Sequence, residues 1–165
     1  MNLGLNVISS VEDLQAATAK NPIVEKLVKA FCDEYTATHQ YMIAKHICRG
    51  VGYADVVHEY EQHMKEEFDH GQLILKRLEQ LGFKLSYDLA GINNGGNPWT
   101  PITLSLPKEQ LLILINAERD AQAFYQEVIE AAKGQKDWIT NRLFKQLQAD
   151  ECEHETDLTR IFEGL

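Results

Sequence analysis

The sequence is poor in the features that mark secreted, membrane-bound and disulfide-stabilised proteins. It has three cysteines, Cys32, Cys48 and Cys152, and no Cys-x-x-Cys pair, which argues against a disulfide framework and for reduced thiols. The longest apolar run, Leu111 to Ile115, is far too short to cross a membrane. The chain does not open with a basic segment followed by an apolar one, as a signal peptide does. We therefore expect a cytoplasmic protein with no membrane partner.

Positive charge is also scarce. Sixteen Lys and Arg residues stand against 25 Asp and Glu, which gives a formal net charge of −9. A nucleic-acid-binding protein needs a clustered basic surface, and the sequence has no basic tail, so no nucleic-acid partner is expected. An acidic surface suits a protein that collects cations, although most acidic proteins use their charge only to remain soluble.

Four long segments carry helical signals. Each is about 26 residues long, which is roughly 40 Å at the rise of an α-helix. A glycine ends one of these segments and directly follows each of the other three, and helices of such similar length are typical of a bundle. A chain of 165 residues is the size of one domain. The expected helices cover approximately residues 22–49, 54–81, 107–134 and 137–163.

The links between these helices predict how they are connected. The first and last links are only a few residues long, so each joins an antiparallel hairpin. The middle link, residues 83–106, contains the turn-rich run 93–98 and is long enough for a crossover along the bundle. Residues 1–20 are expected to form an arm or a short helix. The sequence thus predicts an all-α four-helix bundle, two hairpins joined by a long crossover, in a single domain over residues 1–165.

Two Glu-x-x-His pairs, Glu67 with His70 and Glu151 with His154, carry the first functional signal. Residues three apart on a helix lie on nearly the same face, so both side chains of a pair can reach one metal ion. One such pair alone is weak evidence, because a histidine in a glutamate-rich chain often has a glutamate three residues before it.

The surroundings of the two pairs make the signal much stronger, because they repeat. In each half of the chain a glutamate, Glu34 or Glu118, precedes the Glu-x-x-His pair by 33 residues. A tyrosine, Tyr41 or Tyr125, follows that glutamate by seven residues, two turns along the same helix face. Solvated surface charges have no reason to repeat at matched offsets. We interpret the pattern as an internal duplication built around a site.

Physical chemistry indicates that this site binds metal. Four glutamates converging inside a bundle would repel one another and lose several kcal/mol each on desolvation, a penalty that divalent cations remove. Four carboxylates with two imidazoles suit two first-row metal ions, with Glu67 and Glu151 placed to bridge them. Mixed oxygen and nitrogen ligation favours iron or manganese over calcium.

This arrangement resembles the ferritin-like superfamily, and within it the bacterioferritin type of di-iron centre. In that family one helix of each hairpin supplies a glutamate and the other supplies a Glu-x-x-His pair. The resemblance covers residues 22–163, and it implies that Tyr41 is similar to the tyrosine beside the bacterioferritin centre. The metal ligands that it implies are Glu34, Glu67, His70, Glu118, Glu151 and His154.

Two departures refine the resemblance. Bacterioferritins bind haem through a methionine just after the first Glu-x-x-His glutamate, and this chain has Phe68 there, so no haem is expected. Shells of 24 subunits carry a short fifth helix, and only eleven residues follow His154. These departures favour a Dps-like mini-ferritin, a dodecamer with a bacterioferritin-type site in each subunit.

The resemblance implies a ferroxidase, an enzyme that binds two Fe(II) per subunit and oxidises them with dioxygen or hydrogen peroxide. Fe(III) would be stored inside a homo-oligomeric shell, which links iron storage to protection from oxidative stress; manganese is the competing metal. One alternative is a di-metal oxidase or hydroxylase that acts on an organic substrate without a storage shell. Another is a DNA-binding shell, against which the missing basic tail argues.

Several other side chains could bind or support metal, and among them the four remaining histidines have no duplicated partner. Most of the remaining histidines are expected on helix surfaces, with one or two available for entering or stored metal. At least two of the glutamates that flank the ligands are expected to be solvated, and the others could support the ligands. Buried packing is expected for the cysteines near the ligands, with a redox role as the alternative. These residues are His39, His46, His58 and His63, then Glu66, Glu153 and Glu155, and finally Cys32 and Cys152.

Overall fold

Helices make up most of the chain in the computed structural model, which describes residues 6–98 and 100–165. The chain divides into two compact units. The first unit consists of Met1–Thr36 and Phe68–Trp99, and the second consists of Ala37–Glu67 and Thr100–Leu165. Helices α2, Ile23–Ile47, and α3, Tyr53–Gln80, each contribute one part to the first unit and one part to the second.

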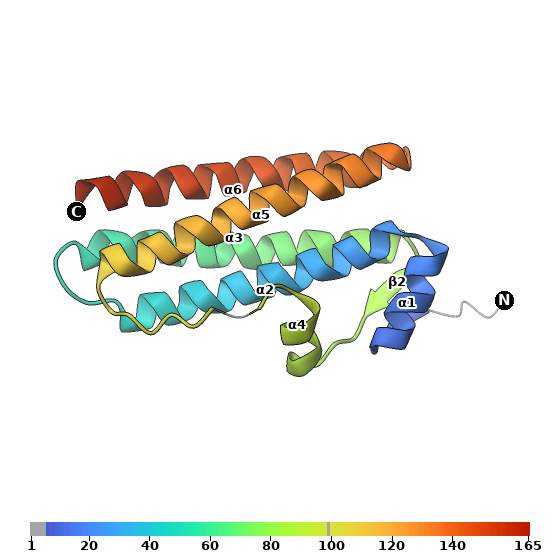
Figure 1. The fold of residues 1–165 in the computed structure, drawn as a ribbon, viewed down its shortest axis with the longest axis horizontal. Helices are drawn as coiled ribbons and strands as arrows, with labels where there is room; N and C mark the ends of the chain where they lie inside the picture. The colour runs from blue at the N-terminus through green and yellow to red at the C-terminus, as the bar shows by residue number, and fades with distance from the viewer. Residues whose placement is uncertain (1–5, 99) are drawn as a thin grey trace. The chain divides into compact units, whose positions relative to one another are not determined.

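The second unit contains the end of α2, the start of α3 and two complete helices. These are α5, Pro107–Gly134, and α6, Trp138–Gly164, which run side by side in opposite directions (Figure 1). Asp137 caps α6 by accepting a hydrogen bond from the N–H of Thr140 at 3.0 Å, which satisfies a backbone donor that the helix leaves unpaired.

A short link turns the chain from α2 into α3. Gly50 and Gly52 lie in this link with φ of 108° and 77°, a left-handed conformation that glycine adopts without steric cost. A Cβ atom at Gly52 would collide with the side chain of Leu165. The positive φ of this turn therefore favours glycine at this position.

The core of the second unit is apolar at the helix positions that face inward. Tyr41 and Tyr60 pack with their ring centroids 5.6 Å apart, and leucines of α5 and α6 are fully buried beside them. Each buried leucine contributes roughly 1.5–3 kcal/mol by removal from water. The buried cluster consists of Tyr41, Ala44, Cys48, Val56, Tyr60, Ile102, Leu111, Leu114, Ile115 and Leu158.

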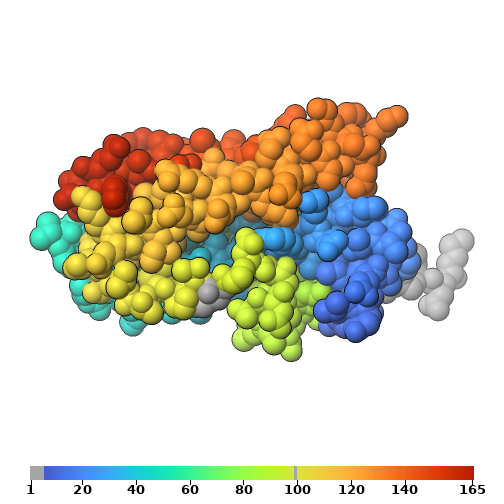
Figure 2. Space-filling view, viewed as in Figure 1, coloured from blue at the N-terminus to red at the C-terminus, as the bar shows by residue number. Residues whose placement is uncertain are grey.

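The first unit adds a small sheet and two short helices to the start of α2 and the end of α3. Strand β1, Asn6–Ile8, pairs in parallel with β2, Phe83–Leu85. Helix α1, Val11–Lys20, follows β1, and helix α4, Leu89–Gly95, follows β2. The surfaces of α1 and of the β2–α4 segment are visible in Figure 2 in blue and yellow-green.

The structure confirms the predicted all-α architecture and its four long helices, with bounds that differ by no more than two residues. It adds features that the prediction did not contain, namely the parallel strand pair and α4 within the long link. In the segment predicted as an arm or short helix, the described residues form β1 and α1, and residues 1–5 lie outside the described part. Among the described residues, no helix is both long enough and apolar enough to span a membrane.

Candidate metal centre

Four of the six predicted ligands meet inside the second unit. Glu67 comes from α3, Glu118 from α5, and Glu151 and His154 from α6. Each side chain is at least 95% buried, and each offers a ligand atom within 4.8 Å of those of the other three. Such a cluster of buried carboxylates around one imidazole is the donor set that a first-row divalent cation requires.

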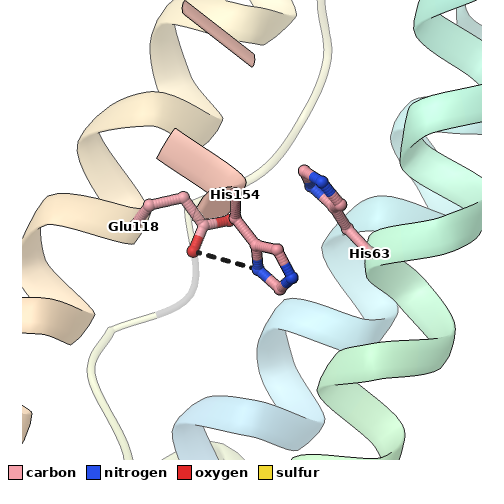
Figure 3. A group of neighbouring side chains, drawn as sticks. All are labelled: His63, Glu118 and His154. Atoms are coloured by element: carbon pink, nitrogen blue, oxygen red, sulfur yellow. Dashed lines mark ion pairs between the residues drawn. The ribbon is translucent and has the colours of Figure 1, made fainter. Parts of the chain in front are cut away.

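The imidazole of His154 faces the carboxylates with one nitrogen. Nδ1 of His154 lies 3.0 Å from Glu151, 3.4 Å from Glu67 and 3.9 Å from Glu118, the last contact being drawn in Figure 3. The opposite nitrogen, Nε2, lies 2.8 Å from a carboxylate oxygen of Glu66. A carboxylate on the far nitrogen fixes the tautomer and orientation of a metal-binding histidine, so Glu66 is suited to support this ligand.

Burial and the close approach of charged side chains shift the pKa values of Glu118 and His154. Burial raises the pKa of Glu118 well above its usual range, and the negative charges of Glu67 and Glu151 raise it further. Burial alone would lower the pKa of His154, but its hydrogen bonds with Glu151 and Glu67 outweigh this and raise the pKa to about 12. Without metal, the side chains of the cluster therefore retain protons, and bound cations would replace these protons.

Tyr41 and His63 form a second layer beside these ligands. The hydroxyl of Tyr41 donates a hydrogen bond to Glu118, and Nδ1 of His63 lies 3.3 Å from the Tyr41 oxygen. The ring of His63 also stacks on that of His154, with centroids 4.0 Å apart and planes 22° apart (Figure 3). Burial and the neighbouring His154 lower the pKa of His63 to about 3, so its ring is neutral. Burial, followed by the charge of Glu118, raises the pKa of Tyr41.

The other two predicted ligands, Glu34 of α2 and His70 of α3, meet inside the first unit. Nδ1 of His70 lies 3.7 Å from a carboxylate oxygen of Glu34, and both side chains are buried. Gly71 follows His70, and a Cβ atom there would already be in van der Waals contact with Phe31 and Glu34, at 3.7 Å. A small residue at this position lets α3 pack closely beside the glutamate.

The two tyrosines of the sequence repeat have different surroundings. Tyr41 lies beside the carboxylates, as described above, whereas the ring of Tyr125 packs edge-on against Phe144 with centroids 5.2 Å apart.

The other histidines and the glutamates that flank the ligands divide into two groups. Three of the four histidines are exposed, as expected for most of them, whereas His63 is 98% buried. Glu66 reaches a ligand, whereas Glu155 contacts Arg119 at 2.6 Å and Glu153 is exposed. The exposed histidines are His39, His46 and His58.

The cysteines near the ligands also differ. Cys32 is buried, and burial, with a smaller contribution from Asp33, raises the pKa of its thiol to about 12. Such a thiol is a poor nucleophile because it is not ionised at neutral pH, which favours packing as its role. Cys152 is exposed on α6, so the expectation of burial is wrong for this residue.

Comparisons with known proteins give one family match and several similar folds. A family model described as a ferritin-like domain matches residues 24–165. The fold is similar to that of the dodecameric thioferritin, a bacterioferritin-related protein from Bacteroides fragilis, with a TM-score of 0.83, 28% identity and coverage of 94% of each chain. No match was found among curated protein sequences.

Two Dps structures share the fold at lower identity. Dps from Thermosynechococcus elongatus has a TM-score of 0.81 and 17% identity, with coverage of 88% of this chain and 93% of that one. Dps from Staphylococcus aureus has a TM-score of 0.81 and 12% identity, with coverage of 94% of this chain and 98% of that one.

Proposed function

The chain belongs to the ferritin-like family, and we propose that it is an iron-storing mini-ferritin that oxidises Fe(II) and retains the Fe(III) product. One observation carries the proposal. Glu67, Glu118 and Glu151 turn their carboxylates toward Nδ1 of His154 inside a buried cluster, where a bound cation would offset their mutual repulsion. Iron is the substrate of this centre, and manganese is its competitor.

We infer that Glu34 and His70 complete the centre, so that six residues bind two metal ions. Their contact in the first unit supports the inference, because a carboxylate and an imidazole at this distance can share one ion. The helix spacing supports it as well, since Glu67 and His70 are one turn apart on α3, as are Glu151 and His154 on α6. Glu67 and Glu151 are then the residues that bridge the two ions.

The chemistry of such a pair is a two-electron oxidation. Two Fe(II) ions give up one electron each; hydrogen peroxide accepts both with two protons and becomes two waters, while dioxygen accepts both with two protons and becomes hydrogen peroxide. The carboxylates stabilise the higher charge of Fe(III) because they are anionic and already in position. Tyr41 orients Glu118 through its hydroxyl, and Glu66 orients His154.

Storage requires a closed shell, and we propose one of twelve subunits. The likeness to a protein described as a dodecameric thioferritin supports this number. Exposed apolar side chains supply surface for subunit contacts, including Phe68, which is 52% exposed, and Trp138, which is 61% exposed. We expect a native mass of about 226 kDa, twelve times the 18.8 kDa of one chain, by light scattering at moderate salt.

Other masses would change this proposal in different ways. A mass of about 451 kDa, 24 times 18.8 kDa, would show that a larger shell forms. A mass of one or two chains would exclude storage in a cavity, and an oxidase acting on an organic substrate would then replace the mini-ferritin.

Iron loading tests the function directly. When Fe(II) is added anaerobically to the metal-free protein and air is then admitted, iron in large excess over the two-ion centre should stay in solution and elute with the shell. Size-exclusion chromatography with iron analysis of the protein peak measures this. If the peak holds two Fe per chain or fewer and the remainder precipitates, the protein oxidises or binds iron without storing it.

A further inference from the structure

A second group of metal-ligating side chains lies next to the centre in the second unit. It consists of Glu59 and His63 of α3 and Asp157 of α6, and each offers one ligand atom within 4.8 Å of the other two. The closest contact joins Nε2 of His63 to a carboxylate oxygen of Glu59 at 3.2 Å. His63 precedes Glu67 by four residues on α3, and Asp157 follows His154 by three residues on α6. The group therefore lies about one helical turn from the ligands of the centre.

His63 presents one ring nitrogen to this group from a buried position. Nδ1 of His63 lies 3.3 Å from the hydroxyl oxygen of Tyr41, which contacts Glu118. Nε2, on the other side of the ring, lies 3.2 Å from a carboxylate oxygen of Glu59. The ring is therefore positioned by its contact with Tyr41 and directs Nε2 toward the carboxylate, as a histidine that binds a metal ion does.

The two carboxylates of the group also oppose each other. The pKa of Glu59 is raised, first by burial and then by the negative charge of Asp157. Arg160 contacts one oxygen of Asp157 at 2.7 Å, but its side chain is 72% exposed, and an ion pair of this kind contributes little. His58 lowers the pKa of Glu59 and Glu66 raises it by a smaller amount, and both effects are smaller than those of burial and Asp157.

Access distinguishes this group from the centre beside it. The side chains of Glu59 and Asp157 are 20% and 28% exposed, whereas His63 is buried at 2%. An ion can therefore reach the carboxylates from solvent while the imidazole supplies a fixed nitrogen ligand. Two oxygens with one nitrogen form a donor set for a first-row divalent cation rather than for calcium or magnesium.

We propose that Glu59, His63 and Asp157 form a third cation site, which binds a first-row divalent ion such as Fe(II). The choice of Fe(II) as the natural ligand rests on the proposed function, whereas the site itself rests on the three side chains. His63 connects it to the centre, since its ring stacks on His154 and its Nδ1 contacts Tyr41.

Anaerobic titration with Co(II) tests this site, because Co(II) takes similar ligands and its visible absorption reports their nature. After removal of weakly bound ions by desalting, the metal-free parent protein should retain three Co(II) per chain. The double variant Glu59→Gln/Asp157→Asn should retain two. The control Glu61→Gln/Glu163→Gln removes the same charge from a partly exposed position of α3 and an exposed position of α6 and should retain three. If the double variant does not assemble, Asp157→Asn alone replaces it, with the same expected loss of one ion.

The outcomes separate this site from the proposed function. Two Co(II) per chain in the parent, or three in the double variant, would overturn the third site and leave the two-ion centre intact. One Co(II) per chain or none in the parent would overturn both. Diffraction from Co(II)-soaked crystals at the metal absorption edge gives an independent measure, because the third site requires a peak among Glu59, His63 and Asp157.

Discussion

Replacing Glu151 with alanine should abolish the fast oxidation of Fe(II), and Glu67→Ala should do the same. In the proposed centre each of these carboxylates bridges both ions, so either substitution removes a ligand from both at once. Loss of groups that only orient metal ligands commonly reduces activity 10–100-fold, so loss of a bridge should reduce the initial rate by more than about 100-fold. Stopped-flow absorbance of the Fe(III) product, at two Fe(II) per chain, measures this rate.

A matched control is available on the same helix. Glu153 lies two residues after Glu151 on α6 and is exposed, so Glu153→Ala removes an equal side chain without entering the centre. This variant should oxidise Fe(II) at the parental rate. If Glu151→Ala also kept the parental rate while remaining folded and assembled, Glu151 would not be a bridging ligand. A Glu66→Gln variant should lie between the two, with a loss of roughly 10-fold, because Glu66 contacts only the far nitrogen of His154.

The six candidate ligands could be found from the sequence because the chain contains the same pattern twice. A glutamate, a tyrosine and a Glu-x-x-His pair recur at equal offsets, and helix geometry places such residues on one face. The structure brings Glu67, Glu118, Glu151 and His154 together in one unit and pairs Glu34 with His70 in the other. Glycines at the ends of long segments likewise predicted the four long helices, since such end signals are local properties of the sequence.

The contacts of His63 and Glu66 with His154 could not be predicted from the repeat. The position that matches His63 in the second half is Leu147, and the position that matches Glu66 is Asp150. The two contacts join α3 to α6 across 91 and 88 residues. One local signal did exist for His63, because Glu59, His63 and Glu67 follow one another at intervals of four residues on one helix face. Contacts between helices depend on their packing, which residue spacing alone does not give.

The strand pair and α4 were missed for a different reason. Strands β1 and β2 have three residues each, and their pairing joins positions 77 residues apart in the chain. Helix α4 has the sequence Leu-Ala-Gly-Ile-Asn-Asn-Gly, which contains residues of low helix propensity. Its start is stabilised by Asp88, which accepts a hydrogen bond from the N–H of Gly91 at 2.7 Å. Elements this short are determined by caps and tertiary contacts rather than by periodicity.

The Glu118→Gln substitution should make the metal-free protein more stable while weakening its response to metal. Glu118 is buried with Glu67 and Glu151, and three carboxylates in one buried cluster repel one another when no cation is bound. A glutamine has nearly the same shape, accepts the hydrogen bond from Tyr41 and donates its amide hydrogens to the neighbouring carboxylates. Removal of unfavourable buried charge commonly stabilises a protein by about 1–4 kcal/mol, which corresponds to roughly 3–10 °C in Tm for a chain of this size.

The difference in stability between the metal-free parent and Glu118→Gln should depend on pH. The pKa of Glu118 in the folded metal-free protein lies above that of the unfolded chain, so the parent loses stability as the pH rises through the folded-state value. The variant has no such carboxyl group, and its advantage should therefore grow with pH. Bound metal reverses the order, because the parent gains a ligand contact that glutamine makes only weakly.

Calorimetry at one scan rate compares the metal-free and Co(II)-loaded forms of the parent, of Glu118→Gln and of the control Asp120→Asn. Asp120 is an exposed carboxylate two residues along α5, and its substitution should leave both melting temperatures near those of the parent. A metal-free Glu118→Gln protein that melts below the parent would mean that the carboxylate of Glu118 stabilises the fold by itself. The cluster would then be a structural network of hydrogen bonds and ion pairs, and the argument that its buried charges require a metal ion would no longer hold.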